Sequence, residues 1–166
     1  MLRTAACGKR IKRSCRGSVS PATCPEVAER ILQELRSEVP AALLPVFRFC
    51  LEHAEQPLSV EQVATACGIR RRALEYRFRR AGLAPPGGCV ARCRLLLAVH
   101  QLEQSADSIE RVAQQYGFGT AGALRKSLAR HLGVAPHAQR RPGAFETAMV
   151  GFLDAIRRGH GTRPSY

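Results

Sequence analysis

Two short segments carry the polar side chains best suited to contact base pairs. The candidates in the first segment are Arg71, Arg72, Glu75 and Tyr76, and those in the second are Thr120, Ala121, Arg125 and Lys126. Arginine can make a bidentate hydrogen bond to guanine O6 and N7, and glutamate can accept one from cytosine N4. The second segment begins with few polar atoms, which leaves methyl contacts to thymine or readout of DNA shape there. We therefore expect the first segment to discriminate sequence and the second to add affinity.

A further set of arginines is better suited to phosphate groups, which position a protein on DNA without specifying its sequence. This set comprises Arg70, Arg77, Arg79, Arg80, Arg130, Arg140 and Arg141. Arg70 and Arg71 suit either role. The alternative for residues 70–72 is a solvated helix start, but three positive charges there oppose the helix dipole and favour a bound anion. The whole chain, with 26 Lys and Arg against 13 Asp and Glu, also favours polyanionic partners.

The other reactive residue types form no recognisable catalytic or metal site. The five histidines and the carboxylates lack the spacing of a nucleophile and its base, so we expect neither enzyme activity nor a cofactor. The seven cysteines contain no C-x-x-C pair, so no metal site is expected. Cys50, Cys67 and Cys93 fall at apolar positions of helical patterns. Metal binding or oxidant sensing is an alternative, unsupported by spacing, for the cysteines of the basic N-terminal stretch, Cys7, Cys15 and Cys24.

Two segments of the chain repeat one helix-turn-helix pattern. In the first, about residues 59–80, Ser59 is an N-cap and Gly68 lies in the turn. The second segment, about residues 108–132, matches the first at its apolar and glycine positions. The first reads Val63-Ala64-(x3)-Gly68-Ile69-(x4)-Leu74-(x3)-Phe78, and the second reads Val112-Ala113-(x3)-Gly117-Phe118-(x5)-Leu124-(x3)-Leu128. Two such units in register are harder to obtain by chance than one. In each unit the second helix would place its N-terminal residues in the major groove, and the base-contact candidates lie there.

The remaining helical patterns predict an all-α fold in which one long linker helix, about residues 88–104, joins the two helix-turn-helix units. The expected organisation is a basic flexible arm at 1–24, a DNA-binding domain at 25–141, and a C-terminal helix and tail at 142–166. The apolar face of the C-terminal helix, from Phe145 to Ile156, is expected to pack on the same domain. Homodimerisation through this face is the alternative.

These motifs resemble the DNA-binding domain of the AraC/XylS family of bacterial transcriptional regulators over about residues 42–141. The resemblance is carried by Val60-Glu61-Gln62-Val63-Ala64, Gly82-Leu83-Ala84-Pro85, Arg92-(x)-Arg94-Leu95, Ile109-Glu110-Arg111-Val112-Ala113-(x3)-Gly117-Phe118, Gly133-Val134-Ala135-Pro136 and Arg140. It implies that Arg72, Glu75 and Tyr76 occupy base-reading positions. It also implies that the two units enter successive major grooves on one face of the DNA.

Four positions depart from the pattern of that family. Leu124 and Leu128 stand where the family has Phe, Ala135 stands where it has Ser, and Gln139 stands where it has Tyr. Leucine keeps the core apolar but fills less space, which predicts looser packing in the second unit. Family members usually carry a separate sensor domain, and residues 1–41 are too short and too poor in strand patterns to form one.

The function expected from the sequence is that of a sequence-specific transcription factor in a bacterial cytoplasm, associated with the nucleoid. Its expected partners are double-stranded DNA and RNA polymerase, and no membrane contact is expected. One alternative is a non-specific nucleic-acid or nucleoid-binding protein, which would bind every sequence equally and with a steep salt dependence. The other is a protein-interaction module on the same fold, which the arginine-rich first segment disfavours.

Overall fold

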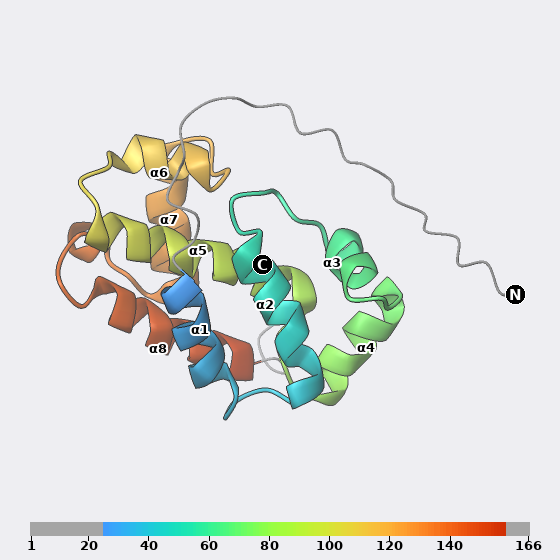
Figure 1. Cartoon of the computed structure of the whole chain (residues 1–166). Helices are drawn as coiled ribbons and strands as arrows, with labels where there is room; N and C mark the ends of the chain where they lie inside the picture. Colours follow the sequence, from blue (N-terminus) through green and yellow to red (C-terminus); the bar gives the residue numbers. More distant parts are fainter. Residues whose placement is uncertain (1–24, 159–166) are drawn as a thin grey trace, which may run out of the picture.

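The computed structural model describes residues 25–158, which form eight α-helices and two short 3-10 helices without a β-strand (Figure 1). The α-helices are α1 Pro25–Leu35, α2 Leu44–Glu52, α3 Val60–Ala66, α4 Arg71–Arg80, α5 Pro86–Gln104, α6 Ile109–Gln115, α7 Ala121–Leu132 and α8 Ala144–Arg157. The 3-10 helices are η1 Ala41–Leu43 and η2 Pro136–Ala138. None of these helices is long and apolar enough to cross a membrane. The prediction of an all-α fold is confirmed for this part of the chain; the expected arm with Cys7, Cys15 and Cys24 lies outside the described residues.

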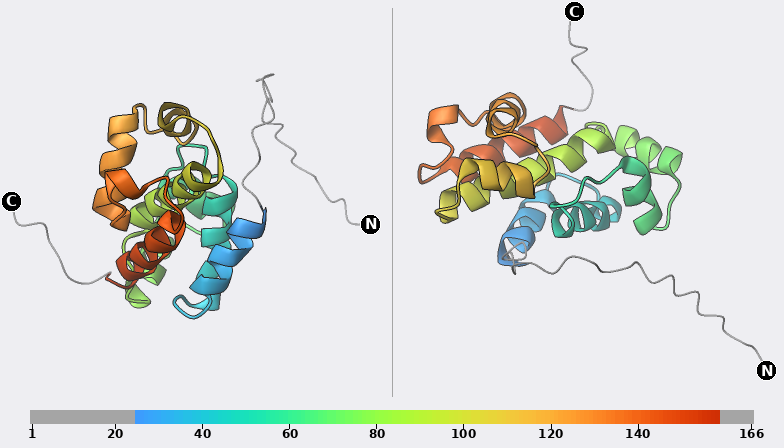
Figure 2. Two further views of the ribbon diagram at one scale, coloured as in Figure 1. Left: turned by 90° about the vertical axis from the view of Figure 1, so that its left-hand side faces the viewer. Right: turned by 90° about the horizontal axis from the view of Figure 1, so that it is seen from above.

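Helix α5 forms the centre of the molecule, and the two helix-turn-helix units lie at its opposite ends (Figures 1 and 2). Its buried side chains point in all directions: Cys89, Val90, Cys93, Leu95, Leu96, Leu97, Ala98, Val99 and Leu102. Residues 95–99 are all buried, so the middle of α5 is covered on every side, and α5 contacts α2, α7 and α8. It begins at Pro86, slightly before the predicted start at residue 88, because proline suits a first turn whose N–H groups have no helical partner.

The sequence repeat is also a repeat of backbone hydrogen bonds. After α3, the Ile69 amide donates to the Ala64 carbonyl at 3.0 Å, and after α6 the Phe118 amide donates to the Ala113 carbonyl at 2.7 Å. Both turns place a glycine, Gly68 or Gly117, in the left-handed region at φ +68° or +71°. Glycine adopts that conformation without the penalty that a Cβ imposes. The same physical solution therefore ends the first helix of both units.

Side-chain caps fix where three of the four helices in the two units begin. The Ser59 hydroxyl accepts from the Gln62 amide at the start of α3, and the Gln62 side chain accepts from the Ser59 amide in return. Ser108 caps α6, and Thr120 caps α7 by accepting from the Ala123 amide at 3.1 Å. Each hydroxyl satisfies an N–H group that the helix leaves without a partner.

Helix α1 packs on α2 and helix α8 packs on α5 and α7, and the Arg30–Glu146 ion pair joins α1 to α8. The apolar face of α8 is buried within this chain, as expected, through Ala144, Phe145, Ala148, Met149, Phe152 and Ile156. The Glu103 carboxylate at the end of α5 accepts from the amides of Gly143 and Phe145, which caps the start of α8. Because this face already packs on α5 and α7, it is not a free surface for a second copy of the chain.

Candidate nucleic-acid interface

The base-contact candidates of the first unit all lie on the outer face of α4. Leu74 and Phe78 are almost completely buried, so the helix presents its other side to solvent. Arg71, Arg72 and Glu75 are exposed on that side. Tyr76 is 53 % exposed, one of only two large hydrophobic side chains within residues 25–158 that are so accessible. An aromatic ring held in solvent beside arginines is available to contact the bases or sugars of a nucleic acid.

Two contacts order the outer face of α4 before any ligand binds. The Arg71 Nε donates to Glu75 Oε1 at 2.8 Å across one helical turn, which raises the pKa of Arg71. The Arg79 guanidinium lies 5.7 Å from the centre of the Tyr76 ring. Such exposed contacts contribute little to stability. They do limit the directions in which Arg71, Glu75 and Tyr76 can point.

The start of α4 lacks the side-chain cap that starts α3, α6 and α7. Its N-cap residue is Arg70, whose side chain makes no capping hydrogen bond. The first turn also contains no acidic residue. The free N–H groups and the arginines at 70–72 therefore leave positive potential at the end of α4 that enters the major groove in a helix-turn-helix protein.

The structure separates the four base-contact candidates of the second unit. Arg125 and Lys126 are exposed on the outer face of α7. Thr120 is exposed, and although its oxygen accepts the capping hydrogen bond, its hydroxyl proton remains free to be donated. Ala121 is only 7 % exposed because it packs toward the core. Its methyl group therefore does not belong to the outer face, and we remove it from the candidate set.

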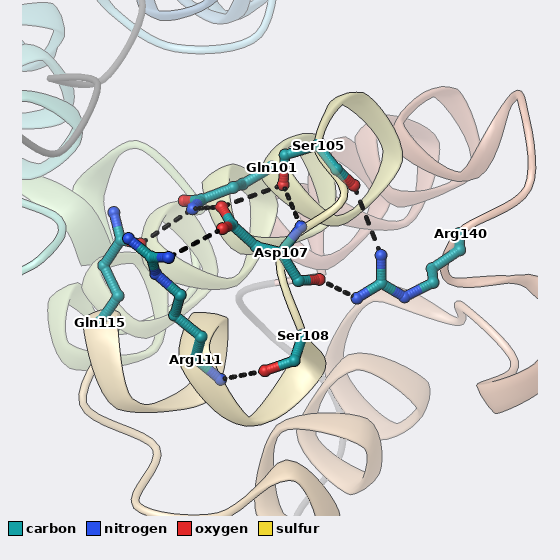
Figure 3. Close-up of polar contacts among 7 residues, drawn as sticks. All are labelled: Gln101, Ser105, Asp107, Ser108, Arg111, Gln115 and Arg140. Carbon is teal, nitrogen blue, oxygen red and sulfur yellow. Dashed lines mark hydrogen bonds and ion pairs between the residues drawn. The ribbon is translucent and has the colours of Figure 1, made fainter.

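All seven phosphate candidates are exposed: Arg70, Arg77, Arg79, Arg80, Arg130, Arg140 and Arg141. Arg140 has a different role. Its guanidinium donates to the carbonyls of Leu102, Ser105 and Asp107, at the end of α5 and in the loop that follows (Figure 3). These carbonyls have no partner within a helix, so a cation is favourable there. We assign Arg140 to joining the second unit to α5 rather than to phosphate.

A chain of polar side chains, which was not predicted from the sequence, ties the second unit to α5 and to the loop between α2 and α3. The Gln101 Nε2 donates to Asp107 Oδ2 at 2.9 Å and to Gln115 Oε1 at 2.8 Å (Figure 3). The Gln115 Nε2 then donates to Glu55 Oε1 at 2.7 Å, which reaches the loop after α2. The hydrogen bonds from Gln101 and Ser105 lower the pKa of Asp107. These contacts fix the start of the second unit against α5 and the loop that leads into the first unit.

Gln139 is the one departure from the family pattern that leaves a polar atom unsatisfied. Its side chain is 2 % exposed, and its Nε2 lies 3.5 Å from the carbonyl oxygen of Arg125. Its Oε1 is buried without a hydrogen-bond partner among the described residues. Burying an amide oxygen without a partner costs free energy. The packing under α7 is therefore weaker than an apolar or fully bonded side chain would make it.

Comparison with known proteins identifies this architecture. The model of a family described as a helix-turn-helix domain matches residues 52–142, more than half of the chain. The chain belongs to this family of AraC-type helix-turn-helix proteins.

One curated relative is described as a transcriptional regulator. A segment of 56 residues is 39 % identical to the HTH-type transcriptional regulator Rv1931c of Mycobacterium tuberculosis. This match spans 34 % of the chain and 22 % of the relative, so most of the relative has no counterpart in the matched segment. No solved structure matches the chain.

Proposed function

We propose that the protein is a transcription regulator that binds a specific DNA sequence through both of its helix-turn-helix units. The observation that carries the proposal is the structural repeat: two units with the same turn geometry present exposed basic helices from the two ends of one buried helix, α5. The family match and the relative described as a transcriptional regulator support the same function.

Helix α4 supplies most of the sequence discrimination in this proposal. Arg72 donates to guanine, Glu75 accepts from cytosine, and Tyr76 packs against bases or sugars at its side. Arg71 keeps its terminal Nη groups for DNA because its contact to Glu75 uses Nε. The uncapped start of α4 adds its backbone N–H groups to a nearby phosphate.

Helix α7 adds affinity and a second, simpler contact. Arg125 and Lys126 lie one helical turn beyond the start of α7, where they can reach a base edge or the adjacent phosphates. The exposed first turn carries only Gly122 and Ala123, which offer close backbone approach and a methyl group. The second half-site is therefore expected to tolerate more sequence variation than the first.

The rigid connection between the units sets the spacing of the two half-sites. Successive major grooves on one face of B-DNA are about 34 Å, or about ten base pairs, apart. Helix α5 packs against both α4 and α7, and the Gln101–Gln115–Glu55 hydrogen bonds fix α6 against α5 and the loop before α3, which favours one relative position of the two units. DNA that does not match this geometry must bend, and the cost of bending becomes part of the specificity.

Selection from a random DNA pool at physiological salt tests this function. We expect a bipartite motif with half-sites about ten base pairs apart. Arg72→Ala should lose the guanine preference at one position and about 1–3 kcal/mol of binding free energy. The matched control is Arg36→Ala, an exposed arginine outside both units. Recovery of no motif, together with equal and strongly salt-dependent binding of all sequences, would instead establish a non-specific DNA-binding protein.

A further inference from the structure

A basic groove lies away from the proposed base-reading residues. It is formed by the start of α5, the end of α7 and one face of α8, and its volume is about 1100 Å³. Small-molecule sites typically have volumes of about 300–1000 Å³. Arg130 in its wall is about 15 Å along α7 from Thr120, at 1.5 Å of rise per residue. The groove is therefore at the opposite end of the recognition helix from the start of its base-reading surface.

Four basic residues from α5, α7 and the end of α8 line the groove: Arg92, Arg130, His131 and Arg158. Asp154 is the one acidic residue in its lining, and its carboxylate already lies 3.7 Å from Arg157 and 3.3 Å from Arg158. Positive charges gathered in a concave surface repel one another unless an anion compensates them. The groove therefore has a net positive charge.

Arg92 and its surroundings suit the binding of an oxyanion. The Arg92 Nε is buried and has no hydrogen-bond partner among the described residues. Its guanidinium folds over Gly88, where a Cβ would lie only 2.7 Å from Nη1. The absence of a side chain at Gly88 therefore leaves room for the Arg92 guanidinium, whose Nε donor is unused.

The positive charges of Arg92 and Arg130 also act on His131. Partial burial, followed by repulsion from Arg92 and Arg130, lowers the pKa of His131. An anion placed among these side chains would favour the protonated ring and raise its pKa.

We propose that this groove binds a small polyanion that carries phosphate or carboxylate groups. Arg92 and Arg130 bind its oxygens by charge-assisted hydrogen bonds, and His131 and Arg158 add positive charge from α7 and α8. The site goes beyond the proposed DNA-binding function, because a ligand here is held by the end of α7 rather than by its base-reading residues.

The test uses the full chain without DNA, with inorganic pyrophosphate and citrate as probes at constant ionic strength. The pKa of His131 is followed by NMR, and His131→Gln assigns its signal. We expect saturable binding that raises this pKa. Arg92→Gln and Arg130→Gln should each weaken binding by about tenfold or more, which is the contribution of a charged hydrogen bond. Arg36→Gln, distant from the groove in sequence and exposed, is the matched control.

The alternative outcomes overturn the proposal in distinguishable ways. Arg130 is exposed, so its variant tests the site even if the variant of half-buried Arg92 fails to fold. Equal loss of binding in Arg36→Gln, or no saturation, would show general attraction of anions to a basic protein. If a DNA duplex raises the pKa of His131 and displaces pyrophosphate, the groove is part of the DNA interface. Because the binding of pyrophosphate and citrate is first measured without DNA, failure of that binding would leave the proposed function standing.

Discussion

At the scale of single residues, similar side chains have different roles because of what surrounds them. Arg140 and Arg141 are adjacent and both basic, yet only Arg140 donates to three carbonyls around the end of α5. Thr120 and Ala121 are also adjacent, but one is an exposed cap and the other is buried. The local sequence does not distinguish these cases, because the deciding partners are far away along the chain.

Gln139 gives the first prediction at this scale. Gln139→Met keeps the length of the side chain and removes the amide whose Oε1 is buried without a partner. The variant should raise the free energy of unfolding by about 1 kcal/mol or more, since the cost of burying that amide disappears. Urea denaturation measures the change. Gln33→Met, at an exposed position of α1, is the control and should change the value by less than about 0.5 kcal/mol. A destabilised Gln139→Met would show that the amide is satisfied in solution.

At the scale of helices, the sequence predicted the two helix-turn-helix units well because their signals are local. Ser59, Ser108 and the glycines Gly68 and Gly117 mark helix ends through caps and turns within a few residues. The hydrogen bonds among Gln101, Gln115 and Glu55 could not be predicted in this way. Periodicity shows which face of a helix is apolar, but it does not show which polar side chains meet across the fold.

The backbones of α8 and α7 come close together at Gly151 and Leu132, and this contact gives a prediction at the scale of helices. A Cβ on Gly151 would lie 2.8 Å from the carbonyl carbon of Leu132 and against its oxygen, so the helices must separate. Gly151→Ala should lower the free energy of unfolding by about 1–3 kcal/mol.

Gly122→Ala is the matched control for that substitution. A Cβ on Gly122 meets nothing closer than 3.9 Å. The same change there should stabilise α7 by up to about 1 kcal/mol, because alanine favours a helix over glycine. Equal effects of the two substitutions in urea denaturation would contradict the close packing of α7 and α8.

At the scale of the whole molecule, stability should depend on pH through two histidines with a lowered pKa, His100 and His131. Burial is the main cause of the lowered pKa of His100, whose ring meets Phe145 edge-on at 5.2 Å, and of His131. A lowered pKa means that the unfolded chain binds more protons than the folded chain below about pH 6.5. The stabilisation is therefore fully present above about pH 6.5 and is lost as the pH falls below it.

The pH prediction is tested by measuring the free energy of unfolding at several pH values between neutral and mildly acidic. We expect the free energy of unfolding to decrease as the pH is lowered over this range. His100→Leu should reduce the slope of this dependence without abolishing it, because His131 remains. A slope that His100→Leu leaves as steep as in the unaltered protein would show that other groups control it.

The central claim at this scale is that α5 and the polar contacts beside it hold the two recognition helices in one relative position. The most direct measurement is DNA affinity as the distance between the two selected half-sites is varied. Inserting about five base pairs, half a turn of B-DNA, should reduce affinity to that of a single half-site, because it turns the second half-site to the far side of the duplex. Affinity that does not change with spacing would contradict a rigid two-unit reader.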